Sequence, residues 1–328
     1  MAALTWRWTV PSDQTITSAT YANDLLAAIN AVVTANSGAA DAIWEVATYQ
    51  STSPRYVLLR RKQGSPNPPG RIIFFGQNGS TANANAIYPG ASGTNMVMIG
   101  YSPSSTSDTQ DQSYLSGAPL TATDYLRAVP FNVNTGATSE SYRCYYGEHD
   151  SGFVFIVLRK QKAIAPSIGA FFGAAGELFV DTNGTFLPAL ISSGNSQVST
   201  WTAATSLAYV DGGISGSYSS SNPALIVLKD GVLFTGFRMF SPVAAANENA
   251  LLLDSDSTVN FMPIPIILNP LRTGRTAITG RLRQIAYGPQ ALQETFLHDA
   301  ATDVVTAHAL CPAIAAVGDA MWFVNVEV

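Results

Sequence analysis

The chain has 328 residues and a formal net charge of −5, from 17 Lys and Arg against 22 Asp and Glu. Charged residues make up 12% of the chain, about half the usual share of a globular protein, and hydrophobic residues make up 47%. This hydrophobic content excludes a disordered chain, and the slight acidity argues against a nucleic-acid binder, which needs a basic face. We expect neither a secretory signal nor a membrane span, because no suitable apolar run is present.

The first regular element in chain order is predicted to be a helix. Ser18 is a plausible N-cap, and the helix is expected to end near 36–38, where Asn-Ser-Gly follows an Ala-rich stretch. Apolar residues recur at helical spacing at Tyr21, Leu25, Ala28 or Ile29, and Val32. The pattern is typical of a helix that packs against a core.

The rest of the chain is predicted to be β-structure. Short runs rich in β-branched and aromatic residues, bounded by turn formers, occur at 55–60, 71–75, 95–99, 153–158, 224–228 and 232–236. Lys229-Asp230-Gly231 joins the last two runs and predicts a tight hairpin over 224–237, because Asp-Gly supplies positive-φ residues. Long polar stretches at 78–85, 102–113 and 192–200 predict exposed loops.

These elements predict a mainly β fold, with antiparallel sandwich- or barrel-like domains and one short N-terminal helix. A weak repeat pairs 57–63 and 74–76 with 156–161 and 171–173, which suggests two related strand-turn-strand units or a chance similarity between short strands. We place the N-terminal helix and a first β domain at 1–145 and a second β domain at 146–328. A further division near Ser221 is the alternative.

The candidates for chemistry include the three histidines, His149, His298 and His308. Glu148-His149-Asp150 places two carboxylates beside an imidazole, but neighbours in an extended chain point to opposite faces, so we interpret the triplet as a polar turn. His298 and His308, with Asp299 and Asp303, are the possible ligands of a metal site. They lack the helical i, i+4 histidine pair or cysteine partner that would favour one.

Other acidic and cysteine residues give no diagnostic motif. Two acidic doublets occur in the sequence, Asp108 with Asp111 and Asp254 with Asp256. A calcium site would need a full loop pattern around them, which is missing, so we expect solvated turns. Cys144 and Cys311 are interpreted as small buried hydrophobes. Asn78 and Asn183 match the glycosylation pattern and are interpreted as turn residues.

No nucleophile elbow, phosphate-binding loop or dinucleotide fingerprint is present in the sequence, so we predict no catalytic residues, cofactor or metal, and no enzymatic activity. Lysine occurs at four positions and arginine at thirteen. The excess of arginine over lysine suits packed interfaces, but a GC-rich genome would give the same excess. The tryptophans suit either a sugar-stacking face or core packing, and they are Trp6, Trp8, Trp44, Trp201 and Trp322.

The apolar C-terminus predicts a further strand at 321–326, with Trp322 and Val324 on one face and Phe323 and Asn325 on the other. Such a strand belongs either to the chain's own core or to the sheet of a neighbouring molecule. Deleting 320–328 is expected to give insoluble protein in the first case. In the second case the truncated chain folds but fails to enter particles.

Both ends of the chain resemble virion structural proteins of tailed bacteriophages. At the N-terminal end the resemblance covers the tryptophan-bearing start, the Ala-rich helix and the runs at 44–49, 56–59, 71–76, 84–90 and 98–103. At the C-terminal end it covers Gly-Arg-Leu-Arg-Gln-Ile-Ala-Tyr-Gly-Pro at 280–289, Gln-Glu-Thr-Phe at 293–296 and the closing strand. The resemblance implies a component of the virus particle and carries over no catalytic residue.

We therefore expect a structural protein of a tailed-phage virion, associated with the tail or baseplate and assembled in the host cytoplasm. Its expected partners are other virion proteins and copies of itself, with no nucleic acid and no membrane. The alternative is a receptor- or carbohydrate-binding module that recognises host surface glycans through its polar loops and aromatic residues. A polysaccharide-degrading enzyme ranks last, because the sequence nominates no acid pair.

Overall fold

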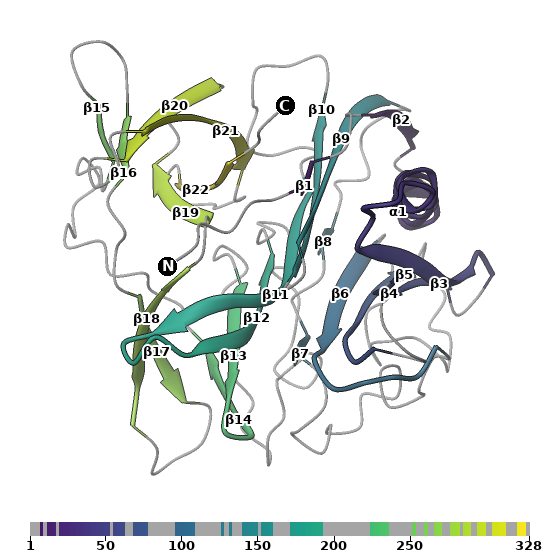
Figure 1. Cartoon of the computed structure of the whole chain (residues 1–328). Coiled ribbons are helices and arrows are strands. Elements are labelled where there is room, and N and C mark those ends of the chain that lie inside the picture. Colours follow the sequence, from purple (N-terminus) through teal and green to yellow (C-terminus); the bar gives the residue numbers. More distant parts are fainter. Residues whose placement is uncertain are drawn as a thin grey trace.

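The structure is a computed structural model of the whole chain. It describes residues 7–8, 12–17, 20–52, 55–62, 68–77, 96–108, 126–127, 131–132, 140–149, 152–159, 171–192, 224–235, 251–253, 259–261, 266–270, 276–282, 285–289, 294–299, 304–312 and 320–325. These residues form one helix and three sheets (Figure 1). The mainly β, largely antiparallel architecture with an N-terminal helix confirms the predicted fold class.

The helix, α1 (Tyr21–Ser37), ends at Gly38 as the sequence predicts. Its N-cap is Thr20, and the carboxylate of Asp24 accepts hydrogen bonds from the Thr17 amide at 2.8 Å and the Thr20 hydroxyl at 2.9 Å. These bonds satisfy donors near the start of the helix. The predicted cap, Ser18, lies outside the described residues.

One sheet has six strands, ordered β3-β4-β5-β6-β7, with β8 pairing with β6 as well. They are β3 (Trp44–Gln50), β4 (Arg55–Arg61), β5 (Arg71–Gln77), β6 (Met96–Ser102), β7 (Leu126–Arg127) and β8 (Phe131–Asn132). All neighbours are antiparallel. The predicted strands at 55–60, 71–75 and 95–99 are thereby confirmed as β4, β5 and β6.

A second sheet has ten strands. They are β1 (Arg7–Trp8), β2 (Ser12–Ile16), β9 (Glu140–His149), β10 (Gly152–Arg159), β11 (Phe171–Asp181), β12 (Phe186–Ser192), β13 (Ala224–Lys229), β14 (Val232–Thr235), β17 (Ile266–Pro270) and β18 (Ile278–Leu282). Both strand-turn-strand units of the weak repeat are antiparallel pairs, β4 with β5 and β10 with β11. Residue 145 lies within β9, and the domain boundaries near 145 and 221 stay predictions.

Six of these strands close into a ring of antiparallel pairings, β11-β12-β13-β14-β17-β18 and back to β11. The ring is possible because β11 has two neighbours along one edge. Residues 171–176 of β11 pair with β10, and Phe179–Asp181 pair with β18. The change of partner coincides with a register shift between Gly176 and Phe179, where Gly176 has a φ of 142°. A bulge at this point bends β11 away from β10 and into the barrel.

The third sheet contains the C-terminal strand, in the order β15-β16-β20-β21-β22-β19. Its strands are β15 (Leu251–Leu253), β16 (Val259–Phe261), β19 (Ile285–Pro289), β20 (Glu294–Asp299), β21 (Val304–Pro312) and β22 (Ala320–Asn325). Only β16 and β20 pair in parallel within the described strands. The predicted C-terminal strand is confirmed as β22.

Strand β22 lies between β21 and β19 and pairs with both. It is therefore an interior strand of the chain's own sheet. Deleting 320–328 is expected to separate β19 from β21 and expose two strand edges, which promotes aggregation. The measurement is the soluble fraction after expression, and a soluble, folded truncation would contradict this expectation.

The main core lies where α1 packs between the first sheet and β9. Leu25, Ile29 and Val33 of the helix are fully buried, in one cluster with side chains from both sheets. Those sheet residues include Val57, Leu59, Ile72, Phe74, Val97, Ile99, Cys144 and Tyr146. Ala175 and Leu190 extend the cluster to the barrel strands, so helix, first sheet and barrel share one apolar core.

The predicted hairpin is present as β13 and β14, with Lys229 opposite Val232. Asp230 has a φ of 51° and Gly231 a φ of 71°, the two positive values that a tight turn of this kind needs. Space is open around Gly231, so a substitution there meets no atom within 4 Å.

Gly231→Val is expected to lower the free energy of unfolding by about 1 kcal/mol or more, because a β-branched residue resists positive φ. Urea unfolding measures the loss. Gly231→Asn is the matched control and should lose less, since asparagine tolerates this conformation. Equal stability of the valine variant and the unmodified chain would contradict the role of the turn.

Candidate functional site

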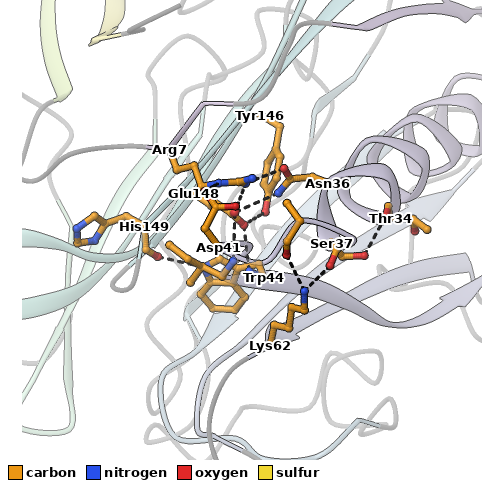
Figure 2. Close-up of polar contacts among 12 residues, drawn as sticks. Arg7, Thr34, Asn36, Ser37, Asp41, Trp44, Lys62, Tyr146, Glu148 and His149 are labelled. Carbon is orange, nitrogen blue, oxygen red and sulfur yellow. Dashed lines mark hydrogen bonds and ion pairs between the residues drawn. The ribbon is translucent and has the colours of Figure 1, made fainter.

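The most heavily bonded carboxylate in the described structure belongs to Glu148, near the end of β9. Its side chain is completely buried. It accepts hydrogen bonds from Arg7 Nη1 at 2.6 Å, Asn36 Nδ2 at 3.0 Å, the Ile43 amide at 3.1 Å, the Trp44 amide at 3.0 Å and the Tyr146 hydroxyl (Figure 2). The sequence prediction of a polar turn is therefore wrong for Glu148 and His149, which belong to the strand.

The five donors come from four parts of the fold: β1, the end of α1, the start of β3 with the residue before it, and β9 itself. Glu148 thus joins the first sheet and the helix to the ten-stranded sheet. A buried carboxylate needs such partners, because removing it from water without them costs several kcal/mol.

One cation in this cluster is shared between two carboxylates. Arg7 bonds Glu148 and also the exposed Asp41, at 2.7 Å. The hydrogen bond with Asp41 raises the pKa of Arg7, although partial burial opposes this, and the hydrogen bond from Arg7 lowers the pKa of Asp41. Burial, with the nearby Glu148 charge, raises the pKa of Tyr146 well above its usual value, so its hydroxyl stays protonated and donates.

This arrangement suits a structural junction better than acid–base catalysis. The Glu148 carboxylate is enclosed and its oxygens are occupied by internal donors. The imidazole of His149 points away from the cluster, whereas its backbone carbonyl accepts from Trp44 Nε1 at 3.2 Å (Figure 2). Glu148 and His149 therefore do not form a shared site, as the alternation along a strand predicts; Asp150 lies outside the described residues.

Trp44 is fully buried and serves as a second link at this junction. Its Nε1 also donates to the carbonyl of Gly152, at 3.1 Å, so one indole ties both ends of the β9–β10 turn. The guanidinium of Arg61 lies 5.8 Å from the ring centroid, within reach of a cation–π interaction. Trp44 is a core residue and is not available for sugar stacking.

A second buried charge, Arg71 at the start of β5, bonds the segment that precedes β5 and the segment that follows β6. Its guanidinium is fully buried and donates to the carbonyls of Pro68 at 2.7 Å, Gly70 at 2.9 Å and Thr106 at 2.8 Å. Asp108 completes the set, bonding both Arg71 and Arg60, the residue opposite Arg71 on β4. Asp108 is thus paired with two arginines.

A third ion pair closes one end of the barrel. Asp181, at the end of β11, is 2.5 Å from Lys229 Nζ and accepts the amides of Asn183 and Thr185, both at 2.9 Å. The hydrogen bond from Lys229 is the main cause of the lowered pKa of Asp181. Asn183 sits in this exposed turn, as expected of a turn residue.

A lowered carboxyl pKa stabilises the native state above the unfolded value, and that stability is lost as the pH falls through the native value. The advantage of the unmodified chain over Asp181→Asn is therefore expected to be full above the ordinary aspartate pKa of about 3.9. It should disappear below the lowered native pKa. Urea midpoints across this range measure the difference.

The matched control for this experiment is Asp230→Asn, which removes an exposed charge from the neighbouring turn and keeps a residue that tolerates positive φ. A pH-dependent advantage over Asp230→Asn of the same size would show that Asp181 has no special part in acid stability.

The remaining candidates are not assembled into a site in the described regions. His298 is opposite Val305, and His308 is opposite Thr295, so the two histidines are not cross-strand partners. Asp111, Asp254, Asp256, Asp303 and Asn78 lie outside the described residues. Within the described ranges, no three His, Cys, Asp or Glu residues are grouped closely enough to hold a metal ion. Burial raises the pKa of Cys144 to about 12, as expected of a small buried hydrophobe.

Sequence reasoning missed the charged residues that join the fold, Arg7, Arg71 and Asp181. One available signal was their rarity: in a chain with 12% charged residues, a charge within an apolar strand run needs a partner. Arg71, before Ile-Ile-Phe-Phe, and Asp181, after Leu-Phe-Val, both fit this description. The partners themselves have no local signal.

The described helix lacks the length and apolarity needed to cross a membrane. Comparison of the chain with protein families, curated proteins and solved structures found no match.

Proposed function

We propose that the chain is a non-enzymatic structural component of a tailed-phage virion, associated with the tail or baseplate. In the particle it contacts other virion proteins and copies of itself. The assignment to a particle rests on the sequence resemblance described for both chain ends, to which the comparisons add nothing, and the arrangement of charge supports the structural role.

The structural role is supported by charged side chains that are buried and bonded to other groups of the same chain. Glu148 and Arg71 are fully buried and bonded within the chain, and Asp181 is 5% exposed and bonded to Lys229. A binding or catalytic site needs charged groups that a ligand can reach, whereas these groups fasten strands and turns to one another. The chain as a whole has few charged residues, and depletion of charge is typical of interface cores.

The proposal is tested by cryo-electron microscopy and mass spectrometry of native particles. The expected result is a fixed copy number of this chain at the tail or baseplate, with the ring β11-β12-β13-β14-β17-β18 recognisable as a barrel. Recovery of the chain only from the soluble fraction, away from purified particles, would contradict the proposal.

Absence of catalysis is tested separately, by incubating the chain with host polysaccharide and murein and measuring new reducing ends. No release is expected. The control is Asp254→Asn, which removes one carboxylate of the acidic doublet at 254 and 256; release that this substitution abolishes would favour an enzyme.

The rival function, recognition of host glycans, is tested by glycan-array binding of the unmodified chain. Burial of Trp44 removes one of the aromatic residues that such a surface would use. Specific binding to one class of glycan, at micromolar or lower concentration, would favour the receptor-binding alternative.

A further inference from the structure

The turn between β11 and β12 presents an Asn-Gly pair at the surface of the barrel. Residues 182–186 are exposed, and within them Asn183 is followed directly by Gly184. Gly184 has a φ of 81°, and no atom lies within 4 Å of the position that a Cβ would occupy. The backbone nitrogen of Gly184 is therefore not shielded by a side chain of its own residue or by other atoms on that side.

An asparagine that precedes a glycine can lose its amide group without an enzyme, because no Cβ on the glycine blocks the approach of its nitrogen. The Gly184 nitrogen forms a bond to Asn183 Cγ, the bond from Cγ to Nδ2 breaks, and ammonia leaves with the proton of the Gly184 amide. Water then opens the resulting cyclic imide at one of its two carbonyl carbons. The products are aspartate and isoaspartate.

The native turn holds the nitrogen that this reaction needs. The Gly184 amide donates to the Asp181 carbonyl at 2.9 Å, and the Asp181 amide donates to the Thr185 carbonyl at 3.0 Å. The Asp181 carboxylate accepts the amides on either side of Gly184, those of Asn183 and Thr185, both at 2.9 Å. A nearby carboxylate also opposes loss of the Gly184 amide proton, since the nucleophile would be an anion. The reaction therefore requires the turn to open.

The same turn is fastened to two other strands of the barrel. Lys229, at the end of β13, is 2.5 Å from the Asp181 carboxylate. Asp181 is also opposite Gly280 of β18, and the Thr182 amide donates to the Thr279 carbonyl at 3.1 Å. Opening of the turn at 181–185 is thus coupled to the Lys229 contact and to the β11–β18 pairing that closes the barrel.

We propose that Asn183 is a latent site of spontaneous deamidation, which the turn around Asp181 holds unreactive and which reacts when that turn opens. Isoaspartate adds one methylene group to the main chain between Asp181 and Thr185, so the two backbone hydrogen bonds of the turn lose their spacing. Either product also adds a carboxylate two residues from Asp181, and like charges repel. In the isoaspartate form the opening of this end of the barrel is irreversible, a property that goes beyond the proposed function.

The test measures the rate of deamidation at position 183, by mass spectrometry of the proteolytic peptide that contains it. The full chain is incubated at neutral pH, with and without urea. The native chain should react about tenfold more slowly than the unfolded chain, or slower still, because reaction waits for the turn to open. Asn183→Gln should abolish the signal, since the longer side chain places its carbonyl carbon out of reach of a five-membered ring.

Asp181→Ala removes the carboxylate that accepts the two flanking amides, and it should raise the rate at Asn183 in the folded chain by about tenfold. Glu148→Ala is the control for a general loss of stability, because Glu148 fastens a different part of the fold. This control should accelerate the reaction less than Asp181→Ala does.

Equal rates in the native and the unfolded chain would overturn the proposal, since the turn would then give no protection. No reaction at position 183 even in urea would overturn it as well. Equal acceleration by Asp181→Ala and Glu148→Ala would show that unfolding of the whole chain, rather than opening of this turn, limits the reaction. Should Asp181→Ala fail to fold, Lys229→Met replaces it, because it removes the cation that holds Asp181 and keeps an unbranched side chain; the outcomes are read in the same way.

Discussion

Glu148→Ala is expected to lower the free energy of unfolding by about 4 kcal/mol, the range seen when one partner of a buried ion pair is removed. The substitution leaves the Trp44 amide and the Tyr146 hydroxyl without their acceptor in a buried setting, and it removes the carboxylate that Arg7 bonds. Each buried donor that loses its acceptor costs about 1–3 kcal/mol. Urea unfolding followed by circular dichroism measures the loss.

Glu148→Gln separates the loss of charge from the loss of shape. The amide keeps one acceptor oxygen but turns an NH2 group toward donors, so an intermediate loss is expected. The matched control is Glu45→Ala. Glu45 is bonded to the half-exposed Arg60 at 2.7 Å, and a pair of this exposure contributes at most about 1 kcal/mol. Equal losses for Glu148→Ala and Glu45→Ala would contradict the junction role of Glu148.

Gly280→Ala is expected to lower the free energy of unfolding by about 3 kcal/mol, because there is no room for a methyl group at this position. A Cβ on Gly280 would overlap the carbonyl oxygen of Val180 and the ring of Phe179. Gly280 is opposite Asp181 in the short pairing between β18 and β11 that closes the barrel. Hydrogen exchange of the β18 amides should increase together with the loss of stability.

Gly38→Ala is the matched control for this substitution. Gly38 follows α1 in a right-handed helical conformation, with a φ of −69°, and the nearest atom to a new Cβ would be 4.0 Å away. Alanine there should be neutral or stabilise by about 0.4–1 kcal/mol, since it restricts the unfolded chain. A Gly280→Ala variant as stable as Gly38→Ala would show that the β11–β18 seam is not tightly packed.

Elements with local signals were predictable. The Asp230-Gly231 turn needs only the positive φ values that those two residues tolerate, and the sequence places it correctly. The helical spacing of Leu25, Ile29 and Val32 likewise identified the buried face of α1. In both cases the conformational preference depends on residues that are close together in the sequence.

The candidate site was not predictable in this way. Glu148 looked like a turn residue because it stands in a polar triplet, and its burial depends on segments far away in sequence. The donors from Arg7, Asn36 and Ile43 are 141, 112 and 105 residues distant. No short stretch of sequence contains both the Glu148 carboxylate and the distant donors that take the place of water around it.

The sequence by itself therefore determined the strand-rich fold class, the helix, the hairpin turn and the C-terminal strand, because turn conformations and side-chain periodicity are properties of neighbouring residues. Tertiary structure alone decided that six strands close into a barrel and that β1 and β2 pair with β9. It also decided that Glu148 and Arg71 are buried and bonded to other segments of the chain. Desolvation of a charge depends on which segments surround it, and the packing of the whole chain sets those segments.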